Sequence, residues 1–331
     1  MAVTPQTNAT IADLAGIIRE CDDFVICGHV SPDGDCFGSQ LALFHVLKAM
    51  GKRATCVLVR DEEPVASLAF MPGMELMVSA TSYDGPCKTF IGVDVPTRDR
   101  IGEAACRLLD RADVSITIDH HASDVTMCQH VFVDPDVAAA AMLVWDLAKL
   151  LVDEPPLESA VCAYVGLVTD TGGFRFQNTD SRAFDVAAEL VAYGVDPSVV
   201  ATNVFQNRTM ASLRLEALTV DRMLVICDGK ASMSWVTNAD LERFGADKSD
   251  VEPLIDTVRA LDGTVVACML REQDGCVRGN LRAKDDTDVS ELARQLGGGG
   301  HKAVGTCQFP NETMDEMIPK LLKELVELSE Q

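Results

Sequence analysis

The chain has 331 residues, of which 47% are apolar, and its formal net charge is −23. This size and composition fit a folded protein of two domains. The excess of acidic residues disfavours long polyanions, so neither a long nucleic-acid duplex nor an anionic membrane is expected as a partner.

The cysteines and the start of the chain favour a reducing compartment. There are 12 cysteines without a CxxC pair, which argues against a zinc ribbon or a disulfide framework. No apolar stretch is long enough to span a bilayer, and the first residues lack the basic and hydrophobic segments of a signal peptide. A cytoplasmic location is therefore the default expectation.

The first part of the chain alternates short β-branched segments with segments of helical periodicity. The pattern predicts strands at 24–30, 53–59, 89–95 and 114–121, and helices at 39–50, 138–151, 158–170 and 181–194. The strands are almost continuously apolar, as is typical of a parallel sheet covered on both faces by helices. Such a sheet binds its ligand beyond the carboxyl ends of the strands.

The second part of the chain has a different pattern. Residues 194–208 are expected to form a connection that precedes another helix. The segments 230–236, 263–272 and 275–283 resemble antiparallel strands, with helices expected at 238–245, 249–261 and 287–296. We predict an α/β protein with a catalytic, metal-binding domain at 1–200 and a linker at 201–215. A smaller domain with a mixed or antiparallel sheet follows at 216–331.

Four groups of polar residues occur where buried segments end. They are His29, Asp33 and Asp35 in GHVSPDGDCFGSQ, then Asp94, then Asp119, His120 and His121, and finally Asp170 in DTGGF. Each group alone is compatible with an ordinary turn or cap. Together at one sheet edge, carboxylates and imidazoles would repel and desolvate one another unless cations compensate them. Such mixed ligands suit manganese or a similar divalent ion.

The number of candidate ligands indicates two ions instead of one. Six residues qualify, which is more than one open site needs: His29, Asp33, Asp35, Asp94, His120 and Asp170. Two ions held about 3.5–4 Å apart would activate a bridging hydroxide and neutralise a phosphoryl transition state.

In order and spacing, these groups resemble the four motifs of the DHH phosphoesterase superfamily: HxxxDxDxxGS, a strand-end aspartate, DHH and DTGxF. The segment GGGGHKAVG, preceded by NLR, resembles the DHHA1 domain of RecJ-like exonucleases and their small relatives. The short two-domain chain is similar to the nanoRNase branch, which contains oligoribonuclease/pAp phosphatases and cyclic-di-AMP or pApA phosphodiesterases. The resemblance implies a DHH domain, a DHHA1 domain and an active site in the cleft between them.

The resemblance also implies a role for each residue. His29 and Asp33 would bind one manganese ion, Asp35, His120 and Asp170 would bind the other, and Asp94 would bridge them; Mg2+ or Co2+ could substitute. His121 would face the scissile phosphate, while Asp119 would orient its neighbours. Cys36 is expected to pack, because adjacent loop residues point apart. The alanines at 138–141 stand where relatives often have a small hydroxyl residue.

The second domain is expected to bind substrate. Gly298, Gly299 and Gly300 would let the backbone approach a ligand and present amide groups to it, although a glycine loop that ends a helix is the alternative. His301, together with Arg282 as a planar fork for a terminal phosphate, favours the ligand-binding interpretation. Asn280 is a weaker candidate for a base or ribose, and Arg278 is expected to be a surface or packing residue.

The leading hypothesis is a manganese-dependent phosphoric ester hydrolase. It would cut very short oligonucleotides, such as pApA, to mononucleotides and would dephosphorylate pAp. A cyclic-di-AMP phosphodiesterase is the first alternative, and a catalytically inactive nucleotide-binding regulator is an alternative of another class. A homodimer is included among the expected partners. Because all the motif positions are occupied, nothing in the sequence supports the inactive regulator.

Overall fold

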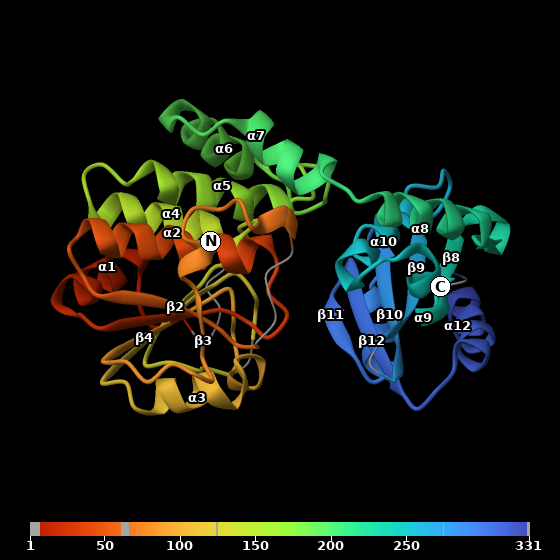
Figure 1. Ribbon diagram of the computed structural model, residues 1–331, viewed down its shortest axis with the longest axis horizontal. Helices are drawn as coiled ribbons and strands as arrows, with labels where there is room; N and C mark the ends of the chain where they lie inside the picture. The colour runs from red at the N-terminus through yellow and green to blue at the C-terminus, as the bar shows by residue number, and fades with distance from the viewer. Residues whose placement is uncertain (1–6, 61–65, 124, 274, 330–331) are drawn as a thin grey trace. The chain divides into compact units, whose positions relative to one another are not determined.

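A computed structural model describes residues 7–60, 66–123, 125–273 and 275–329, except for the side chains of His301, Leu328 and Ser329. The chain divides between Asn207 and Arg208 into two compact units, and each unit is built on a sheet of its own (Figure 1). We call the units unit 1 and unit 2 in chain order.

Unit 1 contains a parallel sheet of six strands in the order β3-β2-β1-β4-β5-β6. The strands are β1 (Phe24–Cys27), β2 (Ala54–Leu58), β3 (Val78–Ser79), β4 (Thr89–Val93), β5 (Val114–Asp119) and β6 (His130–Val133). The chain runs outward from β1 to β3 and then returns to β4 on the other side of β1. The strand order therefore reverses between β1 and β4, which is where open parallel sheets bind their ligands.

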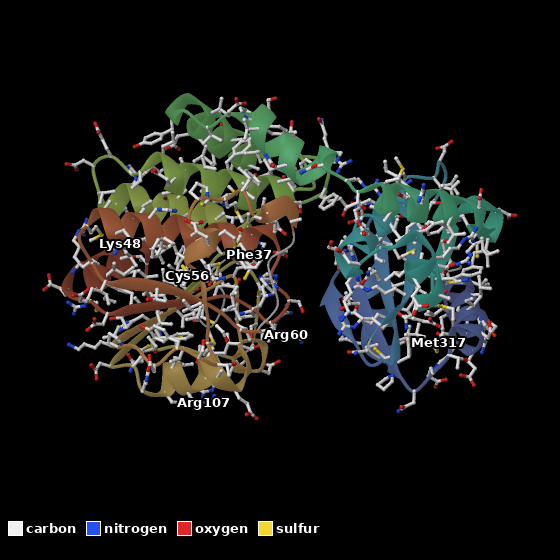
Figure 2. The ribbon with its side chains drawn as sticks, in the orientation of Figure 1. Phe37, Lys48, Cys56, Arg60, Arg107 and Met317 are labelled. Atoms are coloured by element: carbon white, nitrogen blue, oxygen red, sulfur yellow. The ribbon has the colours of Figure 1, made fainter. Side chains whose placement is uncertain are left out.

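Helices cover both faces of this sheet (Figure 1). The helices are α1 (Ile11–Glu20), α2 (Gly34–Ala49), α3 (Gly102–Asp110), α4 (Ala140–Leu151), α5 (Leu157–Asp170) and α6 (Ser181–Tyr193), with 3₁₀ turns η1 (Ala66–Leu68), η2 (Met74–Leu76) and η3 (Arg98–Arg100). The core on one face contains side chains of α1, α2, α4 and α5, and the core on the other face contains side chains of α3. Figure 2 shows Phe37 of α2 and Cys56 of β2 in the interior, where both are buried.

Two segments of unit 1 differ from the prediction because of polar caps. Helix α2 begins at Gly34 and not near 39, because Asp33 Oδ1 accepts hydrogen bonds from the N–H groups of Asp35 (3.1 Å) and Cys36 (3.0 Å). The segment 194–208, expected as a connection, contains α7 (Pro197–Ala201) and the π-helical turn η4 (Thr202–Gln206). The Asp196 side chain caps α7, so a short helix forms here with little apolar periodicity.

Unit 2 contains a mixed sheet of six strands in the order β11-β12-β10-β9-β8-β7. The strands are β7 (Leu224–Ile226), β8 (Ala231–Val236), β9 (Val266–Gln273), β10 (Cys276–Ala283), β11 (Gly299–His301) and β12 (Val304–Pro310). Strands β8 and β9 are parallel, so the expected antiparallel arrangement is wrong for this pair. The connection between them contains α9 (Asn238–Phe244), η6 (Lys248–Val251) and α10 (Leu254–Arg259), and a parallel pair requires such a crossover.

The sheet of unit 2 packs helices on both faces. One core contains α11 (Val289–Gln295) and α12 (Met314–Ser329), and the other contains α8 (Met210–Asp221) and α10. Met317 of α12 is fully buried in the first of these cores (Figure 2). The predicted class, a parallel α/β domain followed by a smaller α/β domain with a mixed sheet, is confirmed. No helix within the described ranges has both the length and the apolar content to cross a membrane.

Candidate metal centre

The loop after β1 places the first candidates. His29 Nε2 lies 3.3 Å from Asp94 Oδ2 and 4.0 Å from Asp33 Oδ1. His29 is buried, whereas 58% of the Asp33 side chain is exposed. Asp33 is held in place by its second role as the cap of α2, which binds one of its oxygens to backbone N–H groups. The His29 and Asp33 side chains thus lie beside one site, and Asp94, which follows the adjacent strand β4, borders the same site.

Asp94 lies at the centre of the cluster, directly after β4. Its φ is 54°, and only 2% of it is exposed. Few residues other than glycine adopt a positive φ, and such strained positions concentrate at functional sites. The Oδ1 atom is buried without a hydrogen-bond partner among the residues that the structure describes. The nearest positive groups to this oxygen are the ring nitrogens of His121 (3.3 Å) and His120 (3.5 Å). A divalent ion could replace their protons, so the position fits a metal ion.

Asp119, the last residue of β5, holds both histidines of the DHH motif. Its Oδ1 accepts hydrogen bonds from the N–H groups of His120 (2.7 Å) and His121 (3.1 Å) and lies 2.9 Å from His121 Nδ1. The contact to Nδ1 places a proton on that atom and fixes the orientation of the His121 ring. These are the contacts that an orienting residue must make.

The His120 ring faces three carboxylates. Its Nδ1 lies 3.3 Å from the Val137 carbonyl oxygen, which fixes a proton on that nitrogen. Its Nε2 lies 3.5 Å from Asp94 Oδ1 and 3.8 Å from the nearest oxygens of both Asp35 and Asp170. A backbone carbonyl behind one nitrogen and carboxylates before the other is the usual environment of a metal-binding histidine.

Asp35 is a candidate ligand that also holds helix α4. Its Oδ2 accepts a hydrogen bond from the Ala140 N–H (2.6 Å), and its Oδ1 accepts bonds from the Ala141 N–H (2.9 Å) and Ser39 Oγ (3.2 Å). Helix α4 has no side-chain cap from its own N-cap residue, Ala139. Asp35, which belongs to α2, caps α4 instead. The start of α4 therefore needs no hydroxyl group from the alanines at 138–141.

The candidates form three overlapping groups, in each of which the ligand atoms lie within 4.8 Å of one another: Asp35, His120 and Asp170; His29, Cys36 and Asp94; and Asp94, Asp119, His120 and His121. The third group joins the other two, because it shares His120 with the first and Asp94 with the second. Cys36 therefore lies with the candidate ligands and not apart from them as expected, and its buried Sγ is 3.3 Å from the His29 backbone N. Its first-turn position on α2 brings the thiol back toward the end of β1.

His120 and His121 favour the protonated form. Burial lowers the pKa of His120, but the contact with Asp94 and the charge of Asp170 outweigh it and raise that pKa to about 10. Burial also lowers the pKa of His121, but the contacts with Asp119 and Asp94 outweigh burial and raise this pKa to about 11. The carboxylates thus stabilise positive charge at both rings.

The pKa values of the carboxylates shift in different directions, according to the neighbours of each one. Burial and the nearby carboxylates Asp33 and Asp94 raise the pKa of Asp170 to about 7. Burial, with Asp94 and Asp170, also raises the pKa of Asp35 well above its ordinary value. At Asp94 the three histidines outweigh burial and hold the pKa well below the ordinary value. Protons therefore neutralise part of this cluster, and divalent ions could replace those protons.

The substrate residues predicted in unit 2 lie on neighbouring strands. Arg282 of β10 lies opposite Val304 of β12, which in turn lies opposite His301 of β11. The next row joins Asn280, Thr306 and Gly299 in the same way. The strand pairing thus brings together the two predicted segments, although the side chain of His301 lies outside the description.

The glycine segment is partly a strand and not only a loop. A Cβ atom on Gly298 would lie 1.8 Å from the Thr306 carbonyl oxygen, and one on Gly300 would lie 2.0 Å from that of Val304. These two glycines are therefore required by the close approach of β12. A Cβ atom on Gly299 would meet nothing within 4 Å, so among the three predicted glycines Gly299 has open space for a ligand.

Arg282 is a cation without a carboxylate partner in the described part of unit 2. It is half-buried, and its Nη1 donates to the Leu281 carbonyl oxygen (3.0 Å). Burial lowers the pKa of Arg282, but a guanidinium remains charged in proteins. In so acidic a chain, an arginine that forms no ion pair suits an anionic ligand.

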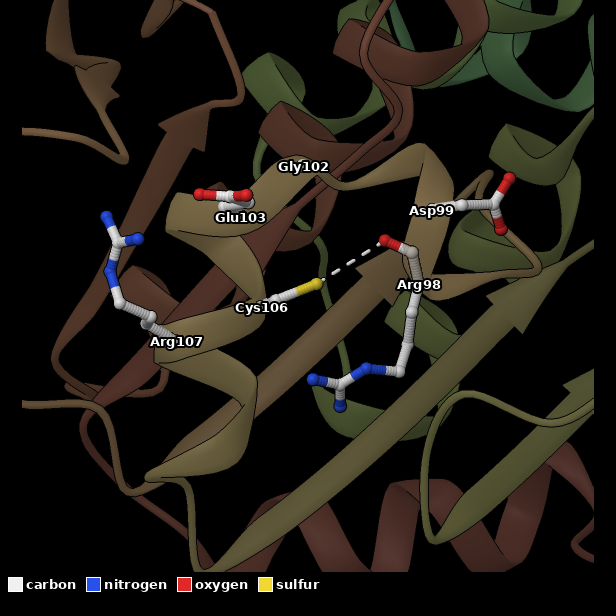
Figure 3. A pocket seen from close by; sticks show the side chains of 6 residues that line it. All are labelled: Arg98, Asp99, Gly102, Glu103, Cys106 and Arg107. Carbon is white, nitrogen blue, oxygen red and sulfur yellow. Dashed lines mark hydrogen bonds between the residues drawn. The ribbon is translucent and has the colours of Figure 1, made fainter.

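A separate hollow of about 520 Å³ lies over η3 and α3 (Figure 3). Its lining residues are Arg98, Asp99, Gly102, Glu103, Cys106 and Arg107. Cys106 Sγ lies 3.4 Å from the Arg98 carbonyl oxygen, and the Arg98 side chain is paired with Asp110 at 2.8 Å. None of the residues predicted from the sequence lines this hollow, so we assign the chemistry to the cluster around Asp94.

Comparison with known proteins agrees with this architecture. The family model for the DHH family, N-terminal domain, matches residues 23–167, and that for the DHHA1 domain matches 231–330. The bifunctional oligoribonuclease and PAP phosphatase NrnA of Thermus thermophilus is 30% identical over 298 residues, which are 90% of this chain and 87% of that protein. The cyclic-di-AMP phosphodiesterase GdpP of Geobacillus thermodenitrificans is 25% identical over 93% of this chain, which corresponds to 48% of that longer protein.

Solved structures show the same fold. An exopolyphosphatase-related protein from Bacteroides fragilis has a TM-score of 0.86 at 24% identity and covers 97% of this chain and 98% of its own. RecJ from Thermus thermophilus, solved in complex with Mn2+, has a TM-score of 0.58 at 15% identity and covers 99% of this chain and 55% of its own. The chain belongs to the DHH/DHHA1 family of phosphoesterases, in its nanoRNase branch. The enzyme class predicted from the sequence is confirmed.

Proposed function

We propose that this protein is a manganese-dependent phosphoesterase that hydrolyses very short oligonucleotides, such as pApA, and dephosphorylates pAp. The observation that carries the proposal is that two ligand groups lie side by side, joined by the 3.5 Å contact between His120 Nε2 and the buried Asp94 Oδ1. The similarity to the oligoribonuclease and PAP phosphatase NrnA over most of both chains supports the choice of substrate class.

Six residues would hold two manganese ions. They are His29, Asp33 and Asp94 for one ion, and Asp35, His120 and Asp170, with Asp94 shared, for the other. Carboxylates and imidazoles suit Mn2+, and Mg2+ or Co2+ could take its place. When bound, the two ions would supply the positive charge that activates water and stabilises a phosphoryl transition state.

His121 would contact the scissile phosphate. Its Nδ1 is held by Asp119 at 2.9 Å, so a contact with substrate would use Nε2. A histidine oriented in this way can donate a charge-assisted hydrogen bond to a phosphate oxygen. Asp119 would act through His121 and His120 and is therefore a positioning residue.

Unit 2 would bind the end of the substrate through Arg282, Asn280, His301 and the glycines 298–300. The net charge of −23 and the aromatic content of 5% leave little scope for a long strand. Long single strands normally require a basic groove with stacking aromatic side chains. A short substrate needs only local cations, and Arg282 is one without a described carboxylate partner.

The similarity to GdpP favours one second candidate, hydrolysis of cyclic-di-AMP by the same residues. Turnover of pApA, pAp and cyclic-di-AMP should be compared at equal Mn2+ together with the metal content by elemental analysis. We expect about two ions per chain and faster turnover of pApA and pAp. Faster turnover of cyclic-di-AMP would establish the second candidate instead. A metal content near zero after loading would contradict both and favour an inactive regulator.

A further inference from the structure

The face of β10 that carries Arg282 also carries Arg278. Residues of a strand alternate between its two faces. On one face of β10, Val277, Leu281 and Ala283 lie in the core with α11 and α12, whereas Arg278, Asn280 and Arg282 are half-buried on the other face. Arg278 is thus a second guanidinium on the face that is proposed to bind substrate.

Arg278 occupies an unfavourable position in the sheet. It lies directly opposite Arg271 of β9, and like charges at such positions destabilise an antiparallel pair. Arg271 is compensated by Glu252, whose Oε1 lies 2.8 Å from its Nη1. Arg278 has no carboxylate partner among the described residues, and its Nε, like that of Arg271, is buried without an acceptor. Its neighbour on the other strand, β12, is the neutral Gln308.

Two nearby acids compensate two other arginines. Glu252 pairs with Arg271, and Asp256 lies 2.9 Å from the Arg259 guanidinium. Neither Arg278 nor Arg282 forms an ion pair within the described ranges, although Asp256 and Glu252 lie near enough to Arg282 to oppose the lowering of its pKa by burial. A buried donor without an acceptor costs free energy in the unliganded protein. Such a donor is found at Arg278, and an anionic ligand would remove its cost.

We propose that Arg278 binds a further phosphate of the substrate, beyond the one bound at Arg282, and so forms a subsite for a third nucleotide. Four residues of a strand span about 13–14 Å, and Asn280 lies between the two arginines. The face of β10 thus offers two guanidinium groups along one extended path. A dinucleotide or pAp lacks a phosphate for Arg278, whereas a trinucleotide has one. This inference rests on the proposed function and adds a preference for length within it.

The test compares pApA with pApApA at saturating Mn2+, for the wild type and the variants Arg278→Gln, Arg278→Lys and Lys323→Gln. Lys323 is the control for the loss of one positive charge, because it is 74% exposed on α12, which packs on the opposite face of the sheet. Arg278→Gln should raise KM for pApApA about tenfold, as for a lost hydrogen bond to a charged group. KM for pApA and kcat for both substrates should not change.

Two further readouts separate binding from structure. For pApApA, the slope of log KM against the logarithm of the salt concentration should be smaller by about 0.7 in Arg278→Gln. This is the change expected when one phosphate contact to a single strand is lost. Arg278→Lys should restore part of the affinity, because it keeps the charge without the planar fork. The melting temperature of Arg278→Gln should equal or exceed that of the wild type, because the variant removes a like-charge pair.

Each contrary outcome has a clear meaning. An equal rise of KM for pApA and pApApA, or no rise for either, contradicts the subsite while leaving the proposed function intact. A fall in melting temperature together with loss of activity on both substrates would show that Arg278 supports the fold. A wild-type protein that hydrolyses neither compound contradicts the proposed function and, with it, the subsite.

Discussion

Replacing Asp35 with asparagine should weaken both metal binding and the fold of unit 1, whereas the same change at Asp170 should weaken metal binding alone. Both carboxylates lie 3.8 Å from His120 Nε2, so both are candidate ligands of one ion. Only Asp35 also accepts hydrogen bonds from two N–H groups at the start of α4, those of Ala140 and Ala141.

The size of the effect follows from these two bonds. The asparagine oxygen can accept one N–H group, but the NH2 group would face the other and leave it unsatisfied in a buried place. Loss of a cap costs about 0.5–2 kcal/mol, and an unsatisfied buried donor costs about 1–3 kcal/mol. Part of this cost is offset, because the change removes one negative charge from a cluster of carboxylates. We expect the free energy of unfolding of the metal-free protein to fall by about 1–3 kcal/mol in Asp35→Asn.

The assay is urea denaturation of both variants in the presence of a chelator, followed by circular dichroism, with Mn2+ content measured separately. The Asp170 side chain is 29% exposed and caps no helix, so Asp170→Asn should unfold at the same urea concentration as the wild type or at a higher one. Equal destabilisation by the two changes would refute the capping role of Asp35. So would an unchanged unfolding midpoint in Asp35→Asn.

Three further outcomes are expected. His120→Ala should lose Mn2+, whereas His121→Ala should keep Mn2+ and lose turnover of pApA; near-normal turnover of both variants at saturating Mn2+ would contradict these roles. Because the folded-state pKa of His120 is about 10 against an ordinary 6.5, its protonation stabilises the metal-free protein fully below about pH 6.5, and this contribution is lost toward pH 10. The melting temperature without metal should therefore fall over that range, and saturating Mn2+ should reduce the fall; a rise without metal would count against the assignment. Arg282→Ala and His301→Ala should raise KM for pApA and pAp but spare hydrolysis of bis-p-nitrophenyl phosphate; equal losses on all three compounds would indicate a role in folding or catalysis.

The parts of the fold that the sequence predicts are those with strong apolar patterns. Strands β1, β4 and β5 are mainly apolar segments, and a candidate ligand follows each of them within two residues, so the sheet edge and its chemistry could be inferred together. Short elements whose formation depends on capping or on pairing with a partner strand were not visible. Helix α7 depends on the Asp196 cap, and β11 consists of two glycines and His301 that pair with β12.

The sequence could not show which side chains serve two purposes. The motif indicates that Asp35 is a ligand, but nothing in it shows that its carboxylate caps a helix 105 residues away. Likewise, the place of Cys36 beside His29 depends on the first turn of α2, which begins earlier than its apolar pattern indicates. Arg278 was expected to be an ordinary surface or packing residue. Its significance appears only from the register of β10 with β9, which places it opposite Arg271.

Initial rates on 5′-labelled RNA of two, five and twenty-four residues, measured with Mn2+ at low salt, distinguish a short-substrate enzyme from a processive one. We expect fast hydrolysis of the two shorter substrates and slow hydrolysis of the longest, because a chain with a net charge of −23 repels a long strand. Added salt should narrow the difference, since it screens this repulsion. Equal rates on the longest and the shortest RNA at low salt would contradict the short-substrate function and favour a RecJ-like processive activity.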